Sequence, residues 1–519
     1  MDKSYWIDSS MEKRKDYAKL QEEINTEITI IGGGLTGLTT AYYLTKEGKD
    51  VAVLEKNSIC SHTSGNTTGK ITSQHGIFYN YLVQSLGKEA ALQYLMANEM
   101  AIKNIKKIID DEKIDCDFDM QDAYIFAQSE EGLQKLRKEQ DALEYLGFNK
   151  SNLQEKIDLK IKEKDLEDTN HLHIQKKVLG ALRFKEQAQF NAYLYGLALA
   201  EKIEERKGKI FENSKVIDVK KVDDGYEIIT EDGKINSKIV IIASHYPIIN
   251  FPGFYFLKMY QETSYLIAIE TNAELFDGMY INAENETISL RTATYGDRRI
   301  VLIGGQNHKT GAKIDLRDCY KRLEEVANEL YPGCKVLYRW NTEDCITLDK
   351  IPYIGEFSNL WPNVYVGTGY KKWGMTSSNV AANIITDKIL GRDNLYEEVF
   401  TSTRLKPIKN YKELGNMLKE VAYSEVINKI RATDEHIKDI KQGEAKIVDI
   451  EGKKVGIYRD EEGKLCAIKP YCTHLGCELS WNNLDKTWDC PCHGSRFTVD
   501  GKSIYDPSIK DLKLYYIDK

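Results

Sequence analysis

The sequence predicts an α/β domain with an interleaved antiparallel sheet, followed by a smaller all-β domain at the C-terminus. Three observations lead to this fold class. Near residue 30, a short apolar strand runs into a glycine-rich turn and then a helix. Residues 255–305 contain stretches that alternate as antiparallel strands do. Residues 433–519 combine short strands with loops that contain cysteine and histidine.

The glycine-rich turn has the complete context of a dinucleotide-binding motif. The motif consists of a strand at 27–31, the turn Gly32-Gly33-Gly34-Leu35-Thr36-Gly37, a helix at 38–47, and a second strand at 50–54 that ends at Glu55. Gly32 permits the tight turn, Gly34 lets a pyrophosphate approach the backbone, and Gly37 allows close packing of helix on strand. Glu55 is expected to accept hydrogen bonds from a ribose hydroxyl, which disfavours a 2′-phosphate there.

Later segments favour FAD over NAD. Residues 61–70 are rich in small hydroxyl side chains, Val216 lies in a strand before a hairpin turn, and residues 364–375 form a second glycine-rich turn before a helix. In this order, the features resemble the FAD-dependent oxidoreductases of the D-amino-acid oxidase and glycine oxidase family. The resemblance covers about residues 26–406 and implies FAD as the cofactor. The predicted cofactor-binding residues are Gly32, Gly34, Leu35, Thr36, Gly37, Glu55, Lys56, Thr67, Thr68, Val216, Gly367, Gly369, Gly374 and Met375.

The same resemblance places a substrate-binding sheet at about 250–340, over the flavin. Arg291, on a predicted strand of that sheet, is a candidate for pairing with a substrate carboxylate. Lys371 or its neighbour Lys372 is a candidate for stabilising reduced flavin, and Tyr260 for orienting the substrate. His75 is either an ordinary polar histidine or a residue close to the flavin, even one attached to it.

Two loops near the C-terminus each supply one cysteine and one histidine. The candidate ligands are Cys472 and His474 in the first loop and Cys490 and His493 in the second. Cys₂His₂ is a known zinc-binding composition. However, one cysteine and one histidine in each half suits a 2Fe–2S cluster in which two cysteines hold one iron and two histidines the other. The segment closely resembles a Rieske iron–sulfur domain, which implies a Rieske-type 2Fe–2S cluster.

The Rieske resemblance also concerns the residues around the cluster. In Rieske proteins of the cytochrome bc type, the cysteines equivalent to Cys477 and Cys492 form a disulfide; two reduced thiols are the alternative. Ser495 matches a serine that donates a hydrogen bond to a bridging sulfur. Phe497 replaces the tyrosine of high-potential members. With one donor fewer, we expect a potential well below the top of the Rieske range of about −150 to +300 mV.

Composition excludes several classes of protein. The 519 residues carry a net charge of −8 with interspersed charges, which argues against nucleic-acid binding. No run of eighteen apolar residues is present, so we expect no transmembrane segment and a cytoplasmic protein. The predicted organisation is an N-terminal arm (1–25), the FAD-dependent oxidoreductase (26–406), a helical linker (407–432) and the Rieske domain (433–519).

Together, the two cofactors predict a dehydrogenase that oxidises a small organic substrate, with an amine or amino acid favoured by the family analogy. Electrons would pass singly through the cluster to an external acceptor, either a protein or a quinone. Two alternatives are left open: an electron-transfer reductase driven by NAD(P)H or a partner, and a non-enzymatic redox-sensing protein. A Rieske oxygenase is disfavoured, because the histidine and carboxylate spacing around 168–173 does not suit its mononuclear iron.

Overall fold

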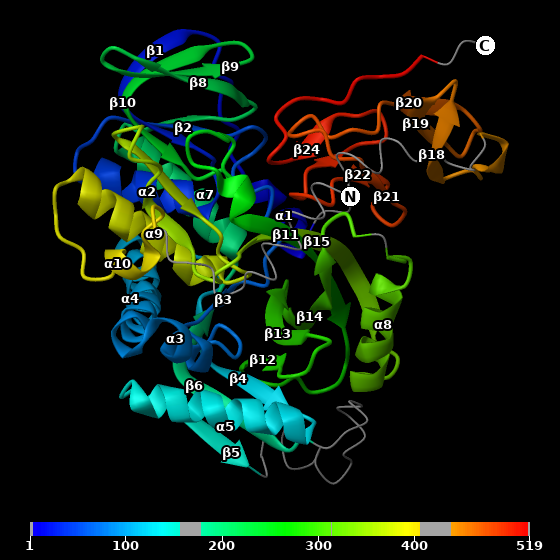
Figure 1. The fold of residues 1–519 in the computed structure, drawn as a ribbon. Helices are drawn as coiled ribbons and strands as arrows, with labels where there is room; N and C mark the ends of the chain where they lie inside the picture. The colour runs from blue at the N-terminus through cyan, green and yellow to red at the C-terminus, as the bar shows by residue number, and fades with distance from the viewer. Residues whose placement is uncertain (1–3, 156–177, 313, 405–436, 517–519) are drawn as a thin grey trace.

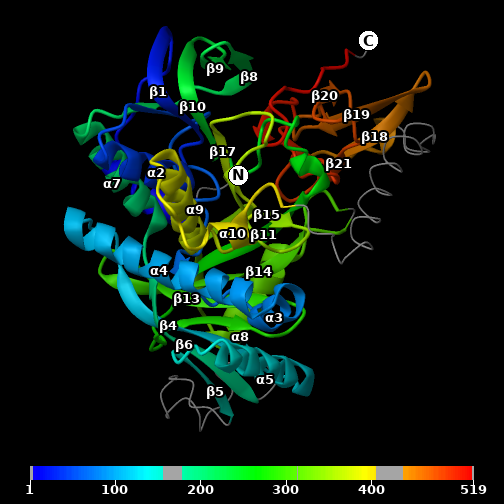
Figure 2. The ribbon, with the colours of Figure 1, turned by 60° about the vertical axis from the view of Figure 1, so that its left-hand side comes forward.

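The computed structural model describes residues 4–155, 178–312, 314–404 and 437–516. An α/β layer lies next to a large, mainly antiparallel sheet, and a small β domain at the C-terminus packs beside both (Figures 1 and 2). This arrangement agrees with the predicted fold class. The predicted helical linker at 407–432 lies outside the described residues.

The α/β layer is built on a parallel sheet. Its order is β16 (Tyr353–Glu356), β17 (Val364–Thr368), β10 (Lys234–Ile242), β1 (Glu23–Ile31), β2 (Val51–Leu54) and β7 (Lys209–Phe211). All neighbouring strands on this path are parallel except β16 and β17. The strands are rich in isoleucine and valine because both faces of the sheet are covered.

Each face of the parallel sheet has a different cover. Ile28 and Ile30 belong to the apolar core shared with the helices α2 (Leu35–Lys46), α7 (Ala192–Glu205) and α9 (Gly374–Ile389). Ile31 and Leu54 face the other way and pack with the hairpin of β8 (Val216–Val222) and β9 (Gly225–Thr230). Side chains of β1 point alternately to the two faces of the sheet, so this strand contributes to both apolar cores.

The second sheet is larger than the predicted range of 250–340. Its order is β15 (Lys335–Thr347), β11 (Met259–Glu270), β14 (Arg298–Lys309), β13 (Ile288–Tyr295), β12 (Met279–Asn282), β4 (Asp119–Ala127), β6 (Gly180–Gln189) and β3 (Lys70–Ile71), with β5 (Ser151–Glu155) beside β6. Strands from residues 70–189 join it through a parallel pairing of β12 with β4. Local patterning did not reveal this pairing, because the two strands lie more than 150 residues apart in the chain.

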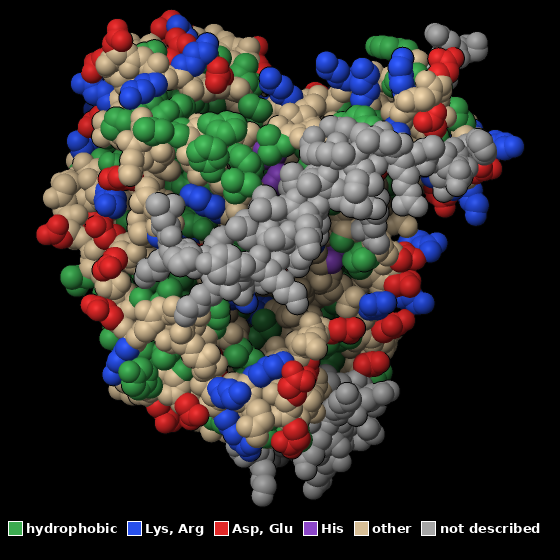
Figure 3. All heavy atoms as spheres, viewed as in Figure 1, with side chains coloured by type: hydrophobic (Ala, Val, Ile, Leu, Met, Phe, Trp, Pro, Cys, Tyr) green, Lys and Arg blue, Asp and Glu red, His purple; other side chains and the backbone are tan. Residues whose placement is uncertain are grey.

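The remaining helices cover the second sheet or link it to the first. They are α3 (Tyr79–Leu86), α4 (Lys88–Glu112), α5 (Glu130–Tyr145), α8 (Cys319–Leu330) and α10 (Glu397–Phe400). Leu323 and Ala327 of α8 pack against Ile267 and Ile303 of the sheet. On the face shown in Figure 3, acidic and basic side chains are interspersed.

The start of the N-terminal arm is part of the core rather than a polar surface segment. The short helix α1 (Tyr5–Ser9) buries Tyr5 and Trp6. The Trp6 indole N–H donates to the carbonyl of Thr67, 2.6 Å away, in the segment rich in hydroxyl side chains. The prediction missed this contact because two aromatic residues in a polar stretch carry no periodicity.

The C-terminal domain contains two small antiparallel sheets. One is formed by β18 (Ala445–Ile450), β19 (Lys453–Arg459) and β20 (Leu465–Ile468), and the other by β21 (Ser480–Asn482), β22 (Thr487–Asp489), β23 (Arg496–Phe497) and β24 (Ser503–Tyr505). Trp488 and Phe497 are fully buried in its core. Across the residues described, no helix has the length and apolar character needed to span a membrane.

Candidate active site and iron–sulfur centre

A cavity of about 620 Å³ lies where the parallel sheet meets the second sheet. Its wall includes residues that follow the carboxyl ends of β1, β2, β10 and β17, the usual place for a cofactor in an open α/β sheet. All the predicted cofactor-binding residues except Gly37 line it. Gly37 instead allows the close packing for which it was singled out.

The glycine-rich turn has room only for glycine. A Cβ atom at Gly32, whose φ is +114°, would lie 2.5 Å from the carbonyl oxygen of Ala243. A Cβ at Gly37 would lie 2.0 Å from the carbonyl oxygen of Gly32, and one at Gly34 would lie 3.0 Å from the Ser64 hydroxyl. The bare backbone at the start of α2 fits the close approach of a pyrophosphate.

Glu55 is held at the end of β2 by backbone donors. Its Oε2 accepts from the N–H of Gly33 at 2.8 Å, and its Oε1 from the N–H of Asn57 at 2.9 Å. Burial nevertheless raises the pKa of the Glu55 carboxyl. This carboxyl lines the cavity in the position that a ribose hydroxyl requires.

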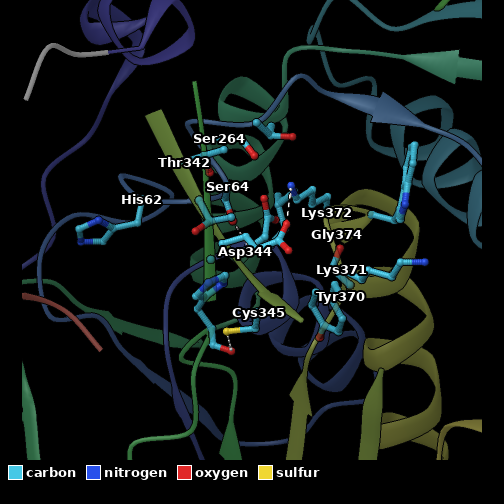
Figure 4. Close-up of a pocket in the computed structure, with 18 of the residues that line it drawn as sticks. His62, Ser64, Ser264, Thr342, Asp344, Cys345, Tyr370, Lys371, Lys372 and Gly374 are labelled. Atoms are coloured by element: carbon cyan, nitrogen blue, oxygen red, sulfur yellow. Dashed lines mark hydrogen bonds and ion pairs between the residues drawn. The ribbon is translucent and has the colours of Figure 1, made fainter. Parts of the chain in front are cut away.

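Two of the three candidate catalytic residues, Lys371 and Tyr260, line the cavity. The Lys371 ammonium lies 3.7 Å from the centre of the Phe78 ring, and burial lowers its pKa to about 7. Lys371 immediately precedes the N-terminal end of α9, near Gly374 (Figure 4). Lys371 and the N-terminal end of α9 would both place positive charge beside a bound flavin ring in the position that the family resemblance implies.

Arg291 does not line the cavity, and its prediction as the substrate-binding arginine is wrong. Its Nη1 donates to the carbonyls of Thr68 and Gly69, each at 2.8 Å, and its Nε to the carbonyl of Thr292 at 2.9 Å. The guanidinium also stacks over Trp6, 5.1 Å from the ring centre. Sequence patterning placed Arg291 on the correct strand, but the carbonyls of the loop at 67–69 occupy its donors.

His75 is a buried histidine that lines the cavity. Its Nε2 lies 2.9 Å from the carbonyl of Thr72, which can only accept, so Nε2 carries the hydrogen. Nδ1 then accepts from the Tyr94 hydroxyl at 2.6 Å. Both nitrogens are occupied, which argues against attachment of a flavin. The ring stacks on Trp373 at the edge of the cavity.

The sequence analysis missed two cavity-lining carboxylates, Glu262 and Asp344. They lie opposite each other on the adjacent strands β11 and β15. Lys372 forms an ion pair with Glu262, with Nζ and Oε2 2.9 Å apart. The sequence could have indicated Glu262, because it lies two residues after Tyr260 on the same strand and its side chain therefore points to the same face of the sheet.

The four predicted cluster ligands converge between the two sheets of the C-terminal domain. Cys472 and Cys490 are buried free thiols, and their hydrogen bond lowers the pKa of Cys472. The rings of His474 and His493 lie 5.0 Å apart and are nearly perpendicular. Both Nδ1 atoms are buried and have no partner among the described residues. Two thiols beside two unpartnered imidazole nitrogens fit a Rieske-type 2Fe–2S cluster.

The other two loop cysteines form the disulfide implied by the Rieske resemblance, Cys477–Cys492. Their sulfurs lie near Cys490, but disulfide sulfurs are not thiolate ligands, so these three cysteines do not make a separate metal site. Ser495 Oγ accepts from the N–H of Ser508 at 3.1 Å, and its own hydroxyl donates a hydrogen bond to Cys472, a predicted cluster ligand. Phe497 is fully buried and offers no hydroxyl.

The cluster loops dock directly on the oxidoreductase part of the chain. Gln261 of β11 donates to the carbonyls of His493 at 2.9 Å and Asp506 at 2.7 Å. The Nε2 of His474 lies 2.6 Å from Oδ1 of Asn250. The Phe256 ring packs near both histidine rings, at 6.2 and 6.1 Å between centres.

A buried charge cluster reinforces this docking. Arg496, with no exposed side chain, pairs with Glu343 of β15 and with Asp485 and Asp489 of its own domain. The backbones are also close, because a Cβ at Gly311 would lie 2.6 Å from the nitrogen of Pro491. Arg496 and Glu343 are fully shielded from solvent at this contact.

The sheet of β11 and β15 lies between the cavity and the cluster loops, and Tyr505, Asp506 and Ile509 of the C-terminal domain also line the cavity. On β11, Tyr260 and Glu262 line the cavity, whereas Gln261 between them contacts the cluster loop. On β15, Asp344 lines the cavity and Glu343 binds Arg496. Side chains of one strand alternate between the two faces, so neighbouring residues reach the flavin cavity and the iron–sulfur domain.

A dinucleotide cradle beside a substrate cavity, with an iron–sulfur centre behind its wall, defines an oxidoreductase that combines a flavin with a cluster. Comparison with known families agrees: residues 27–388 match the family described as FAD dependent oxidoreductase, and residues 432–516 match the Rieske [2Fe-2S] domain. The chain belongs to the FAD dependent oxidoreductase family and carries a C-terminal Rieske domain. Its cofactors are FAD and a Rieske-type 2Fe–2S cluster.

Individual relatives share one or both parts. The protein YhfW of Bacillus subtilis (strain 168), named as a Rieske 2Fe-2S iron-sulfur protein, is 36% identical over 99% of this chain and 98% of its own. Gamma-glutamylputrescine oxidoreductase of Escherichia coli (strain K12) is 23% identical over 75% of this chain and 89% of its own. The crystal structure of glycine oxidase from Geobacillus kaustophilus shares the fold, with a TM-score of 0.61 and 18% identity over 74% of this chain and all of that one.

Proposed function

We propose that the protein is a dehydrogenase that oxidises a small amine or amino acid and passes the electrons one at a time through its own cluster to an external acceptor. The observation that carries the proposal is the docking of the cluster loops on the sheet that walls the cavity. FAD takes two electrons from an organic donor, and a Rieske cluster transfers them singly.

The docked arrangement supports a relay within one chain. The outer nitrogen of His474 is held by Asn250, and His493 is 1% exposed. The histidine edge of the cluster therefore lies against the flavin-containing part of the same chain. A buried Arg496 network holds the two parts together, so electron transfer does not require a diffusional encounter between them.

The relatives support a substrate that contains a C–N bond. Gamma-glutamylputrescine oxidoreductase and glycine oxidase carry an amine and an amino acid in their names. The cavity wall itself also favours a substrate with a positively charged nitrogen, because the carboxylates Glu262 and Asp344 face inward. We propose that the final acceptor is a protein or a quinone that receives electrons from the cluster.

An anaerobic absorbance titration of the FAD- and cluster-replete protein tests this function. Small amines, amino acids and NADH are added separately while the flavin and cluster bands are followed. We expect an amine or amino acid to bleach the flavin and the cluster to be reduced next. Reduction by NADH alone would instead favour a reductase, and no reduction by any donor would favour a redox sensor.

A further inference from the structure

The cavity contains a pair of directly opposed carboxylates. Glu262 and Asp344 are register partners on antiparallel β11 and β15, and both line the cavity. Opposed side chains on adjacent strands have Cβ atoms about 4.5–5.5 Å apart, and like charges there destabilise each other. Such a pair needs a proton or a cation to be stable.

Within the described part of the chain, only Glu262 of these two carboxylates forms an ion pair, although the charge of Lys372 also acts on Asp344. Glu262 Oε2 pairs with Lys372, and Oε1 lies 3.4 Å from the Tyr260 hydroxyl. Among the described residues, Asp344 has no side-chain hydrogen bond or ion pair. In Figure 4, Asp344 lies beside Ser64, on the side of the cavity toward Lys372 and Gly374.

A second group near Asp344 lacks a partner. Thr342 lies two residues earlier on β15, is 8% exposed and lines the cavity. Its hydroxyl oxygen is buried without a hydrogen bond among the described residues. A buried hydroxyl without a hydrogen bond costs free energy unless a polar ligand binds it.

Most cationic side chains in and near the cavity already have contacts within the protein, so they are less available than Asp344 to bind a substrate group. Arg291 donates to backbone carbonyls. Five of the six lysines that line the cavity, all but Lys215, have an ion pair, hydrogen bond or ring contact within the described part of the protein: Lys56 with Asp506, Lys70 with Tyr280 and Ser289, Lys350 with the Tyr81 ring, Lys371 with the Phe78 ring, and Lys372 with Glu262. On β11 and β15 themselves, the charged side chains that line the cavity are the carboxylates Glu262 and Asp344.

We propose that Asp344 is the substrate-binding carboxylate, that it binds the protonated nitrogen of an amine, and that it then accepts the proton from that nitrogen. Thr342 adds a hydrogen bond to the same group. The substrate class is a primary or secondary alkylamine in its ammonium form. This inference rests on the proposed dehydrogenase function and narrows it to substrates anchored through nitrogen rather than through a carboxylate.

The proposed oxidation of the amine conserves protons and electrons. The ammonium transfers one proton to Asp344, which leaves a neutral amine and a carboxylic acid. The adjacent C–H bond then breaks, its electron pair leaves with the hydrogen as hydride to oxidised FAD, and the nitrogen lone pair forms the C=N bond of an iminium ion. The neutral amine is required because an ammonium nitrogen has no lone pair to donate.

The environment of Asp344 suits a proton acceptor that works near neutral pH. Burial raises the pKa of its carboxyl to about 7, Lys372 opposes this shift, and Glu262 and Glu343 add to it. Below pH 7 the carboxyl is mainly neutral and above it mainly ionised, whereas an alkylamine keeps its proton up to about pH 10. Affinity for the cation must therefore rise as pH increases through 7.

Binding of n-butylammonium and of butyrate to the FAD-loaded protein tests the proposal, with calorimetry and the flavin difference spectrum as readouts. We expect n-butylammonium to bind about tenfold more tightly at pH 8 than at pH 6, and butyrate to bind weakly. Asp344→Asn should weaken n-butylammonium binding at pH 8 at least tenfold and abolish the pH dependence. Asp344→Glu should restore binding.

Two further variants separate local from general effects. Asp297→Asn removes the same charge from an exposed turn and should change nothing. Glu262→Gln should move the pH dependence to lower pH, because it removes a neighbouring negative charge and frees Lys372. The FAD content of each variant, measured by flavin absorbance, shows whether the fold is intact.

Unchanged n-butylammonium binding by FAD-loaded Asp344→Asn would overturn the proposal, as would tighter binding of butyrate or no binding of n-butylammonium at pH 8. The outcomes separate this proposal from the proposed function. Amines that bind through Asp344 without bleaching the flavin would refute the dehydrogenase alone. Amines that bleach Asp344→Asn as fast as the unaltered protein would refute the anchor alone.

Discussion

Asn250 is a residue of the oxidoreductase part that holds a ligand of the cluster. Its Oδ1 lies 2.6 Å from Nε2 of His474, the ring nitrogen that faces away from the proposed iron. Such outer partners fix the tautomer of a ligand histidine and increase its basicity. A more basic ligand favours oxidised iron, so Asn250 is expected to lower the cluster potential.

Replacing Asn250 by leucine should therefore raise the midpoint potential of the cluster. Loss of one hydrogen bond worth about 0.5–1.5 kcal/mol corresponds to roughly 20–60 mV for a one-electron couple. A redox titration followed by electron paramagnetic resonance measures the shift. Asn250→Asp keeps an acceptor and should leave the potential at or below its original value; equal potentials in Asn250→Leu and the unaltered protein would contradict this role.

Lys371 supplies a pH-dependent positive charge to the flavin site. Because burial lowers its pKa to about 7, the ammonium form dominates below pH 7 and the neutral amine above it. Lys371→Met should lower the flavin potential below pH 7 by roughly 40 mV, about 2 kcal/mol for a two-electron couple. The difference should disappear above pH 8. Spectroelectrochemistry at pH 6 and pH 8.5 checks this, and a difference that grows with pH would be evidence against it.

At the level of single elements, β15 has two functions on its two faces. Glu343 points to the iron–sulfur domain and Asp344 to the cavity. The alternation of a β-strand makes this possible without any special backbone feature. The pairing of β11 with β15 along twelve residues of β11 gives the wall a fixed register, so both faces keep their side chains in place.

Breaking the charge pair on the outer face should loosen the docked domain. Glu343→Gln leaves the buried Arg496 with only Asp485 and Asp489, and loss of one partner of a buried pair costs about 3 kcal/mol. We expect a lower unfolding temperature by calorimetry and slower reduction of the cluster by the flavin.

The matched control for Glu343→Gln is Asp315→Asn. Its pair with Arg317 is exposed, so the substitution should cost less than about 1 kcal/mol. If the two variants unfolded at the same temperature, the buried cluster would not hold the domains together.

For the whole molecule, local sequence motifs predicted much of the chemistry. The G-x-G-x-x-G turn, the two cluster loops and the order of the two parts depend on residues that are close together in the chain. The disulfide followed from the Rieske resemblance and is confirmed. Boundaries of long amphipathic helices such as α4 were also predictable, because their apolar residues repeat with a helical period.

The contacts between distant segments were not predictable from one sequence. Arg291 was placed on the correct strand, but its partners come from residues 68 and 69, more than 200 positions away. The Glu262–Asp344 pair joins residues 82 positions apart and depends on the register of their two strands, and a shift of one residue would reverse the faces. The docking of the cluster loops depends on the same register.

We propose that the flavin and the cluster form one relay within a single chain. Laser-flash photoreduction of the flavin in the holoprotein, with the cluster band followed over time, tests it most directly. The docked geometry predicts first-order reduction of the cluster, with a rate constant that does not change over a tenfold range of protein concentration. A rate proportional to protein concentration, or a cluster that stays oxidised while the flavin is reduced, would contradict the account.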